Sequence, residues 1–284
     1  MKVFSILKLA SFPDPRPQED YFCISKKYPI FIVADGVSLQ TKDGESYPKQ
    51  SGAGMVARVF CELAMKEAEK RYETFTKEDL KDIFELSNKA VLEYNISCGI
   101  TKNTVNYWDE DFFSATVAFL LIKEKKVYWF SLCDSGLVVF NSKVEKIFNS
   151  PDGWAIFKKH SPKNWENMQE KEKMRMLREE MLRKKYRNVV SEKGELVGYG
   201  VADGEESAKL YLNTGMLNMN TGDLLFLHTD GFENYFSIKE FINIFKLWPK
   251  DIKSKLEGLI SEKSEEDLSK YGLEKTLIAI YADK

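Results

Sequence analysis

Two Asp-Gly pairs in this sequence each follow an apolar run. Residues 30–34 end in Asp35-Gly36, and residues 224–227 lead, after His-Thr, to Asp230-Gly231. An Asp-Gly pair is ordinarily a turn, because glycine accepts positive φ and aspartate bonds the nearby backbone. Three other pairs follow polar or mixed residues and fit that description: Asp43-Gly44, Asp152-Gly153 and Asp203-Gly204. The first two pairs instead predict carboxylates at the ends of buried strands.

Two more acidic positions lie beside strand-like segments. Glu19 and Asp20 come just before residues 21–25, and Asp134 follows residues 126–133. These acids are far apart in the chain, so only folding can bring them together. Carboxylates gathered at one edge of a β-sandwich repel each other, and hard divalent cations offset that repulsion. Oxygen ligands without His or Cys favour Mg²⁺ or Mn²⁺ over zinc.

The segments around these acids predict strands interrupted by helix pairs. Period-two patterns and β-branched or aromatic residues predict strands, and spacings of three and four predict helices. The expected strands cover 2–9, 20–27, 30–35, 112–122, 125–135, 136–142, 208–213, 223–230 and 275–283, and the expected helices cover 49–72, 77–97 and, as a pair, 238–264. The short gaps between 112 and 142 predict an antiparallel meander. We therefore expect an α+β fold in which two antiparallel sheets pack together with helices outside.

The strand pattern is lost between Ile147 and Ser207. This span contains a segment of helical propensity at 165–189, basic at its C-terminal end, and a glycine-rich segment at 192–206. We expect one domain over residues 1–284, with residues 147–207 forming an inserted flap.

The composition excludes several classes of protein. With 43% apolar residues in 284, the chain can bury a large core, and no apolar run is long enough for a membrane span. The net charge of −2 gives no electrostatic reason to bind nucleic acid. The four cysteines form no Cys-x-x-Cys pair, so we expect reduced thiols and a cytoplasmic protein without a membrane or nucleic-acid partner.

The order of these motifs resembles the metal-dependent protein phosphatase family, protein phosphatase 2C, from about Arg16 to Tyr281. The stretch RPQEDYF at 16–22 is similar to the family's opening motif, and VADGVS at 33–38 to its first Asp-Gly motif. The segments at 112–122 and 127–140 resemble its small-Thr-Ala and Gly-Asp-Ser strands, and LLFLHTDGFEN at 224–234 resembles its second Asp-Gly motif. The resemblance implies the same two-sheet sandwich, with a metal centre at one end.

The resemblance also implies a role for each matching acid. Asp35 would bridge two Mn²⁺ or Mg²⁺ ions, and the carbonyl of Gly36 would ligate the second ion. Asp230 would hold the first ion, and Glu19 would reach the second through water. Asp134 would hold a third, loosely bound ion.

Arg16 would bind the phosphate of the substrate. A guanidinium suits this role because its planar fork donates two parallel hydrogen bonds. Two metal ions activate a bridging water for in-line attack on phosphorus, so no covalent enzyme intermediate is needed. Arg16 stands one residue nearer to Asp20 than is commonest in the family.

One departure from the family pattern concerns the last metal ligand. The family has an Asp three residues before a Thr that begins the final strand, but Leu273 occupies that position before Thr276. Glu274 is the nearest substitute and Asp267 a more distant one. Alternation along a strand would oppose Glu274, because neighbouring side chains point to opposite faces.

Smaller departures concern residues beside the expected centre. Cys133 replaces the usual Gly before Asp134, and Val37 stands where many eukaryotic members carry a His thought to act as general acid. His228, two residues before Asp230, either offers a proton to the reaction or satisfies a local hydrogen bond.

The resemblance implies a Mn²⁺- or Mg²⁺-dependent phosphatase of phosphoserine and phosphothreonine, acting on phosphoproteins in opposition to a serine/threonine kinase. We expect it to be a monomer. The alternative is a pseudophosphatase that binds phosphoproteins or regulatory partners without turnover. Leu273 favours this alternative, whereas Asp35 and Asp230 oppose it. A phosphatase of small phosphorylated metabolites would share the same chemistry.

Overall fold

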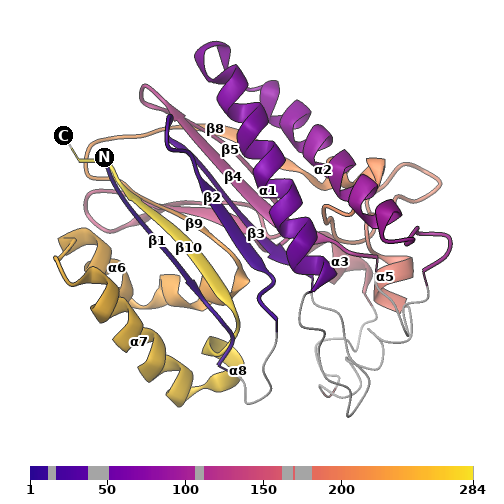
Figure 1. Ribbon diagram of the computed structural model, residues 1–284. Coiled ribbons are helices and arrows are strands. Elements are labelled where there is room, and N and C mark those ends of the chain that lie inside the picture. The colour runs from indigo at the N-terminus through magenta and orange to yellow at the C-terminus, as the bar shows by residue number, and fades with distance from the viewer. Residues whose placement is uncertain (12–16, 38–50, 106–111, 162–168, 170–180, 284) are drawn as a thin grey trace.

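Two five-stranded antiparallel sheets pack face to face in the computed structural model, which describes residues 1–11, 17–37, 51–105, 112–161, 169 and 181–283 (Figure 1). The first sheet has the order β1 (Lys2–Lys8), β10 (Lys275–Tyr281), β9 (Leu224–His228), β6 (Gly136–Phe140) and β7 (Lys146–Asn149). The second has the order β2 (Asp20–Ile24), β3 (Ile30–Gly36), β4 (Ala115–Lys123), β5 (Lys126–Leu132) and β8 (Asn213–Asn218). The predicted fold class is confirmed.

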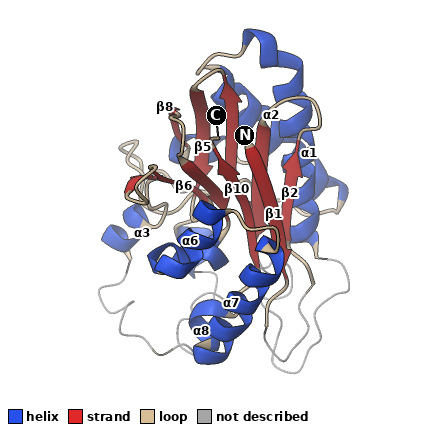
Figure 2. Ribbon diagram, turned by 90° about the vertical axis from the view of Figure 1, so that its left-hand side faces the viewer, coloured by secondary structure: helices blue, strands red, loops and turns tan. Residues whose placement is uncertain are grey.

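A pair of helices covers the outer face of each sheet (Figures 1 and 2). The pairs are α1 (Gly52–Arg71) with α2 (Asp79–Ser97) on the second sheet, and α6 (Lys239–Leu247) with α7 (Ile252–Glu266) on the first. The short elements are η1 (Tyr72–Thr74), α3 (Ala155–His160), α5 (Met181–Lys185), η3 (Glu206–Tyr211), η4 (Asp230–Ser237) and α8 (Leu268–Tyr271). None of the helices in the described ranges is long and apolar enough to cross a membrane.

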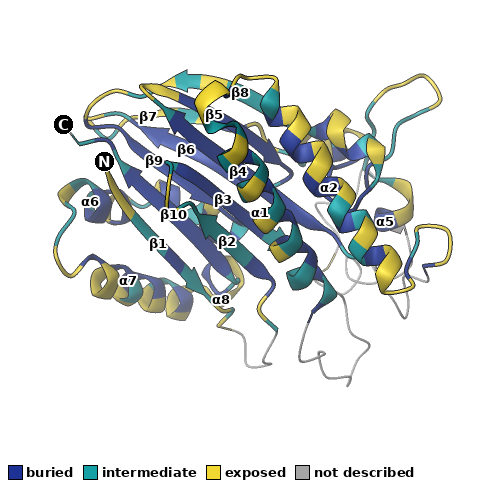
Figure 3. Cartoon of the chain, turned by 45° about the horizontal axis from the view of Figure 1, so that its top comes forward, coloured by how far each residue is buried: buried dark blue, intermediate teal, exposed yellow. Residues whose placement is uncertain are grey.

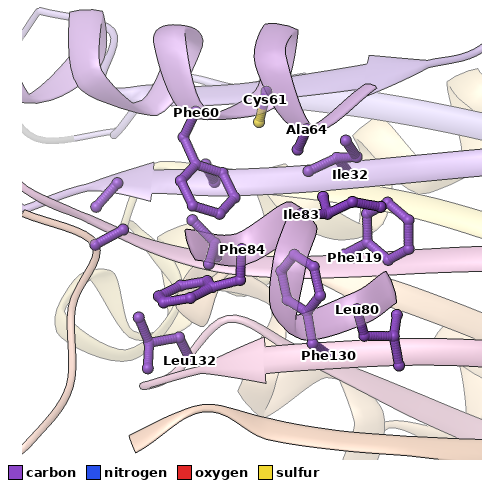
Figure 4. Close-up of a cluster of buried hydrophobic side chains, with 14 of the residues drawn as sticks. Ile32, Phe60, Cys61, Ala64, Leu80, Ile83, Phe84, Phe119, Phe130 and Leu132 are labelled. Carbon is purple, nitrogen blue, oxygen red and sulfur yellow. The ribbon is translucent and has the colours of Figure 1, made fainter. Parts of the chain in front are cut away.

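Buried aromatic side chains make the helices and sheets a rigid support. Figure 3 shows buried strands under helices whose outer sides are exposed. Beneath α1 and α2, the rings of Phe119 and Phe130 stack with centroids 4.9 Å apart, and Phe60 and Phe84 pack edge-on against Phe130 (Figure 4). Burying each such ring contributes roughly 1.5–3 kcal/mol. The strand ends that carry the acids are therefore held in fixed positions.

Three elements differ from the predictions. The predicted strand at 208–213 is mostly the short helix η3, and the actual edge strand β8 begins only at Asn213. Its Gly215 lies opposite Trp129, whose indole fills the space that a Cβ would need. The strand β7 was also missed. The predicted meander divides, because β4 and β5 belong to the second sheet whereas β6 pairs with β9 and β7 in the first.

The segment that connects β7 with β8 begins after Asn149, slightly later than the predicted start of the flap at Ile147. Its described elements are α3, α5 and η3. Most of the helix predicted at 165–189 lies outside the described residues, because only 169 and the residues from 181 onward are included.

Candidate metal centre

The interior of the sandwich changes from apolar to polar at one end. On β3, Phe31 and Val33 face the space between the sheets, so a period of two places Asp35 on the same face. The same alternation extends the interior faces of four other strands to polar side chains at this end: Asp20 before Phe22, Thr116 before Ala118, Thr229 after Leu227 and Thr276 before Ile278. A strip of acids and hydroxyls therefore closes the sandwich at this end.

Strand pairing brings two of these acids together. Asp20 is the register partner of Asp35 across β2 and β3, and Thr116 is the partner of Asp35 on β4. Thr229 Oγ1 donates a hydrogen bond of 2.8 Å to Asp20 Oδ2, which links the two sheets. Asp20 Oδ1 has no hydrogen-bond partner in the described structure. Burial raises the pKa of Asp20 to about 6.

The predicted acids Asp35, Asp134 and Asp230 act on each other electrostatically. Burial raises the pKa of Asp35 well above its usual range, and the charges of Asp20, Asp230 and Asp134 raise it further. Burial also raises the pKa of Asp230, with additional contributions from Asp134 and Asp20. Folding thus collects, at one point, carboxylates that repel each other when ionised.

Gly36 allows β3 to approach the start of α1. A Cβ on Gly36 would lie 2.6 Å from the carbonyl carbon of Ala53, too close for any side chain. Ser51 caps α1 by accepting a hydrogen bond from the Ala53 amide, and its hydroxyl donates to the buried carboxylate of Glu19. Glu19 is thereby positioned beside the acids by the helix N-terminus.

The close contact at Gly36 gives a test of this packing. Gly36→Ala is expected to lower the free energy of unfolding by about 1–3 kcal/mol, because backbone atoms of α1 must move. Gly258→Ala is the matched control, since a Cβ there meets nothing within 4 Å, and it should stabilise α7 by about 0.5–1 kcal/mol. Urea denaturation of both variants measures the difference. Equal stability changes would contradict the packing at Gly36.

Glu274 lies in the turn between α8 and β10, so the expectation that strand alternation turns it away is wrong. Its Oε2 accepts a hydrogen bond of 3.1 Å from the amide of Glu19, and its Oε1 accepts one of 3.2 Å from the amide of Asp20. Burial raises the pKa of Glu274 to about 7, and the charge of Asp20 adds to the effect. Asp267, the more distant substitute, instead caps α8 with an exposed side chain.

The buried Lys275 was missed in the sequence. Its Nζ donates to the carbonyl oxygens of Tyr271, at 2.7 Å, and Leu273, at 2.6 Å, which closes the turn that carries Glu274. Burial lowers the pKa of Lys275 to about 8, while the charges of Asp230, Asp20 and Glu274 favour its charged form. The only sequence signal was a lysine at the start of an apolar strand.

Asp134 lies where the chain passes from β5 of one sheet to β6 of the other. Cys133 has a φ of 62°, so its backbone adopts the left-handed conformation that favours glycine. Asp134 Oδ2 accepts a hydrogen bond of 2.9 Å from Trp154 Nε1. Asp134 Oδ1 is buried and has no hydrogen-bond partner in the described structure.

His228 points away from the acids. It follows Leu227 on β9, so its side chain faces the helices, where it packs against Phe236 with ring centroids 4.7 Å apart. Its Nδ1 lies 3.0 Å from the carbonyl oxygen of Thr229, and burial lowers its pKa to about 4. A neutral imidazole in this position satisfies a local hydrogen bond and does not face the carboxylates. Arg16, the expected phosphate ligand, lies outside the described residues.

The acids fit hard divalent cations bound partly through water. Within the described ranges, no three His, Cys, Asp or Glu side chains form a ready-made metal-binding group. Such a group is not required, because Mg²⁺ retains several waters and commonly uses only one or two carboxylates. The unpartnered oxygens of Asp20 and Asp134, and the mutual repulsion around Asp35, are what cations would satisfy.

Comparisons with known proteins point to one family. A family model described as protein phosphatase 2C matches residues 15–270. The serine/threonine phosphatase PstP/Ppp of Mycobacterium tuberculosis has a similar structure, with a TM-score of 0.56 and 12% identity over 100% of this chain and 99% of that one. Stp1 of Staphylococcus aureus has a TM-score of 0.57 and 13% identity, over 100% of this chain and 95% of that one. A PstP catalytic domain in complex with two manganese ions has a TM-score of 0.54 and 13% identity, over 98% of this chain and 96% of that one. No curated protein matches the sequence.

Proposed function

The chain belongs to the protein phosphatase 2C family, and on that basis we propose that it hydrolyses phosphoserine and phosphothreonine in proteins with the help of Mn²⁺ or Mg²⁺. The observation that supports this proposal is the group of carboxylates at the end of the sandwich. There the charges of Asp20, Asp230 and Asp134 add to the effect of burial in raising the pKa of Asp35. A protein gains nothing in stability from collecting such charges without cations. A kinase acting on the same substrates would oppose this activity.

We assign the ligand roles as follows. Asp35 would bridge two ions, Asp230 would hold the first, and the Gly36 carbonyl and Glu19 would serve the second. Asp134 would hold a third ion. When bound, the ions supply a water of lowered pKa and neutralise the oxygens of the phosphoryl group. The protein residues orient this group of charges, and the packing between Gly36 and α1 holds the bridging carboxylate in place.

A hydrolysis assay tests the proposed activity. We expect release of phosphate from p-nitrophenyl phosphate and from a phosphothreonine peptide in the presence of Mn²⁺, and complete loss of both activities in EDTA. Binding of the phosphopeptide without turnover at any Mn²⁺ concentration would instead support the pseudophosphatase alternative. Hydrolysis of the aryl phosphate alone would favour a small phosphorylated metabolite as substrate.

The substitution of the last ligand by Leu273 predicts weak binding of the first ion. We propose Glu274 as the replacement, because its carboxylate already lies close enough to Asp20 for the charge of Asp20 to contribute to the raised pKa of Glu274. Leu273→Asp is expected to tighten Mn²⁺ binding by at least about 10-fold, since an added anionic ligand increases the attraction. Glu274→Ala is expected to weaken it by a similar factor.

Calorimetric titration of Mn²⁺ into the wild type, Leu273→Asp and Glu274→Ala measures these changes. Glu265→Ala is the control, because this residue is an exposed glutamate on α7. If the wild type already binds two ions tightly and neither variant alters this, another residue must supply the ligand.

We also propose that residues 1–284 form one domain and that residues 147–207 act as a flap beside the centre. The hydrogen bond between Trp154 and Asp134 supports this placement, because it joins the segment to a proposed metal ligand. Loops supported by a rigid scaffold commonly determine substrate choice. We expect the protein to act as a monomer.

A further inference from the structure

An aromatic cluster supports one side of the proposed metal centre. The indole of Trp154 stacks on Tyr199 with centroids 4.6 Å apart, and Phe157 packs edge-on against both rings. Tyr186 also packs edge-on against Phe157, with ring centroids 5.2 Å apart. We call Trp154, Phe157, Tyr186 and Tyr199 the aromatic cluster. All four residues belong to the segment between β7 and β8, which the proposed function places beside the centre.

The backbone next to Trp154 is packed directly against the backbone next to Asp134. A Cβ on Gly153 would lie 2.2 Å from Cys133 Cα, so the two chain segments touch without a side chain between them. Cys133 and Asp134 are adjacent, as are Gly153 and Trp154. The indole therefore has little freedom to move relative to the carboxylate, because both its ring stack and its backbone are fixed.

This arrangement gives the two carboxylate oxygens of Asp134 different surroundings. Oδ2 accepts the indole hydrogen bond at 2.9 Å, and Oδ1 is buried without a hydrogen-bond partner in the described structure. An indole N–H is a donor only and cannot itself ligate a cation. Donation to Oδ2 fixes the rotation of the carboxylate and so fixes the direction of Oδ1. A hydrogen bond to a ligating carboxylate commonly affects metal affinity by 10- to 100-fold.

We propose that Trp154 is a positioning residue that presents Asp134 Oδ1 to a divalent cation, so that cation binding at Asp134 is linked to the packing of the aromatic cluster. This inference rests on the proposed function, in which Asp134 holds a cation. The linkage is reciprocal. Moving the cluster away from Asp134 must weaken cation binding by the same free energy by which a bound cation stabilises the packed position of the cluster.

The test compares the wild type with Trp154→Phe, which keeps an aromatic ring but removes the N–H donor. Trp248→Phe is the matched control, because this tryptophan stacks on Tyr281 at the end of α6, within another part of the fold. Calorimetric titration with Mn²⁺ is expected to show a 10- to 100-fold weaker affinity of Trp154→Phe at the site that Asp134→Asn removes from the wild type. The other sites of this variant, and all sites of Trp248→Phe, are expected to keep their affinity within about twofold, a margin comparable to the additivity error for distant residues.

A double-mutant cycle with Asp134→Asn separates positioning from a general effect on folding. If Trp154 acts through Asp134, the Trp154→Phe change has no further effect on Mn²⁺ binding once Asp134 is neutralised. Equal loss of affinity in both backgrounds would overturn the inference, as would an unchanged affinity of Trp154→Phe at the site that depends on Asp134. A wild type that binds no Mn²⁺ would overturn the proposed function and this inference with it. Wild-type binding with no effect of Trp154→Phe would overturn the inference alone.

Discussion

Asp35→Asn and Asp230→Asn are each expected to lower Mn²⁺-dependent hydrolysis by at least about 100-fold, because loss of hydrogen-bonding partners behind a metal ligand alone costs 10- to 100-fold. Both residues are proposed as direct ligands, so their neutralisation removes charge that a cation needs. The same substitutions should raise the stability of the metal-free protein. Burial and neighbouring acids disfavour ionised Asp35 and Asp230, and an amide carries no such penalty.

This opposite change of activity and stability distinguishes a ligand from a structural residue. The rate of hydrolysis is measured with saturating Mn²⁺, and stability is measured by urea denaturation in EDTA. Asp251→Asn is the control, because this exposed residue lies before α7 and, among the described residues, forms an ion pair only with Lys255. Full activity in both variants would refute the proposed metal centre, and loss of activity together with loss of folding would mean that the acids are structural.

The metal-free protein is expected to become less stable as the pH rises from 6.5 to 8. Asp35 and Asp230 have raised pKa values in the folded state, and the pKa of Glu274 is raised to about 7. Such carboxyls bind more protons when folded than when unfolded, so stability falls with rising pH until they ionise in the folded state. The slope is about 1.4 kcal/mol per pH unit for each carboxyl that stays protonated in the fold.

The interval begins at pH 6.5 for a physical reason. The pKa of His228 is lowered to about 4, so the folded state favours its neutral form and stability from this group is lost only as the pH falls below about 6.5. Lys275, with a pKa lowered to about 8, increases stability only at higher pH. Urea denaturation at pH 6.5 and 8 in EDTA measures the slope. Excess Mn²⁺ and Asp230→Asn should each reduce it, and the part that remains in Mn²⁺ is expected from the buried Asp203, whose pKa burial raises to about 7. A slope that neither treatment changes would place its origin outside the acids.

Continuous apolar runs were sufficient to predict the strands that carry Asp35 and Asp230. Such runs occur in buried strands or buried helices, and these two runs are too short for helices. The strand β8 was not predictable in the same way. Its Gly215 is acceptable only because Trp129 covers it from the neighbouring strand, and that pairing joins residues far apart in the sequence.

The features of the centre that escaped prediction depend on long-range contacts. Asp20 was expected among the acids but was given no role, and only the register of β2 against β3 shows that Asp20 faces Asp35. Lys275 would ordinarily be expected in solvent. It is buried because the turn after α8 offers two carbonyl oxygens to its ammonium group. Local patterns contain neither the register nor the turn.

One interior strand of the first sheet, β10, comes later in the chain than every other described strand. β10 lies between β1, from the beginning of the chain, and β9, and it follows directly after Glu274. On the ribosome, the strands β2 to β5 can pair early, whereas β1 must wait for β10 before it gains a neighbour. Asp20 and Asp35 therefore come together long before Glu274 arrives. A nascent chain would have an incomplete set of acids until β10 inserts between β1 and β9. Metal binding would therefore follow the folding of the first sheet.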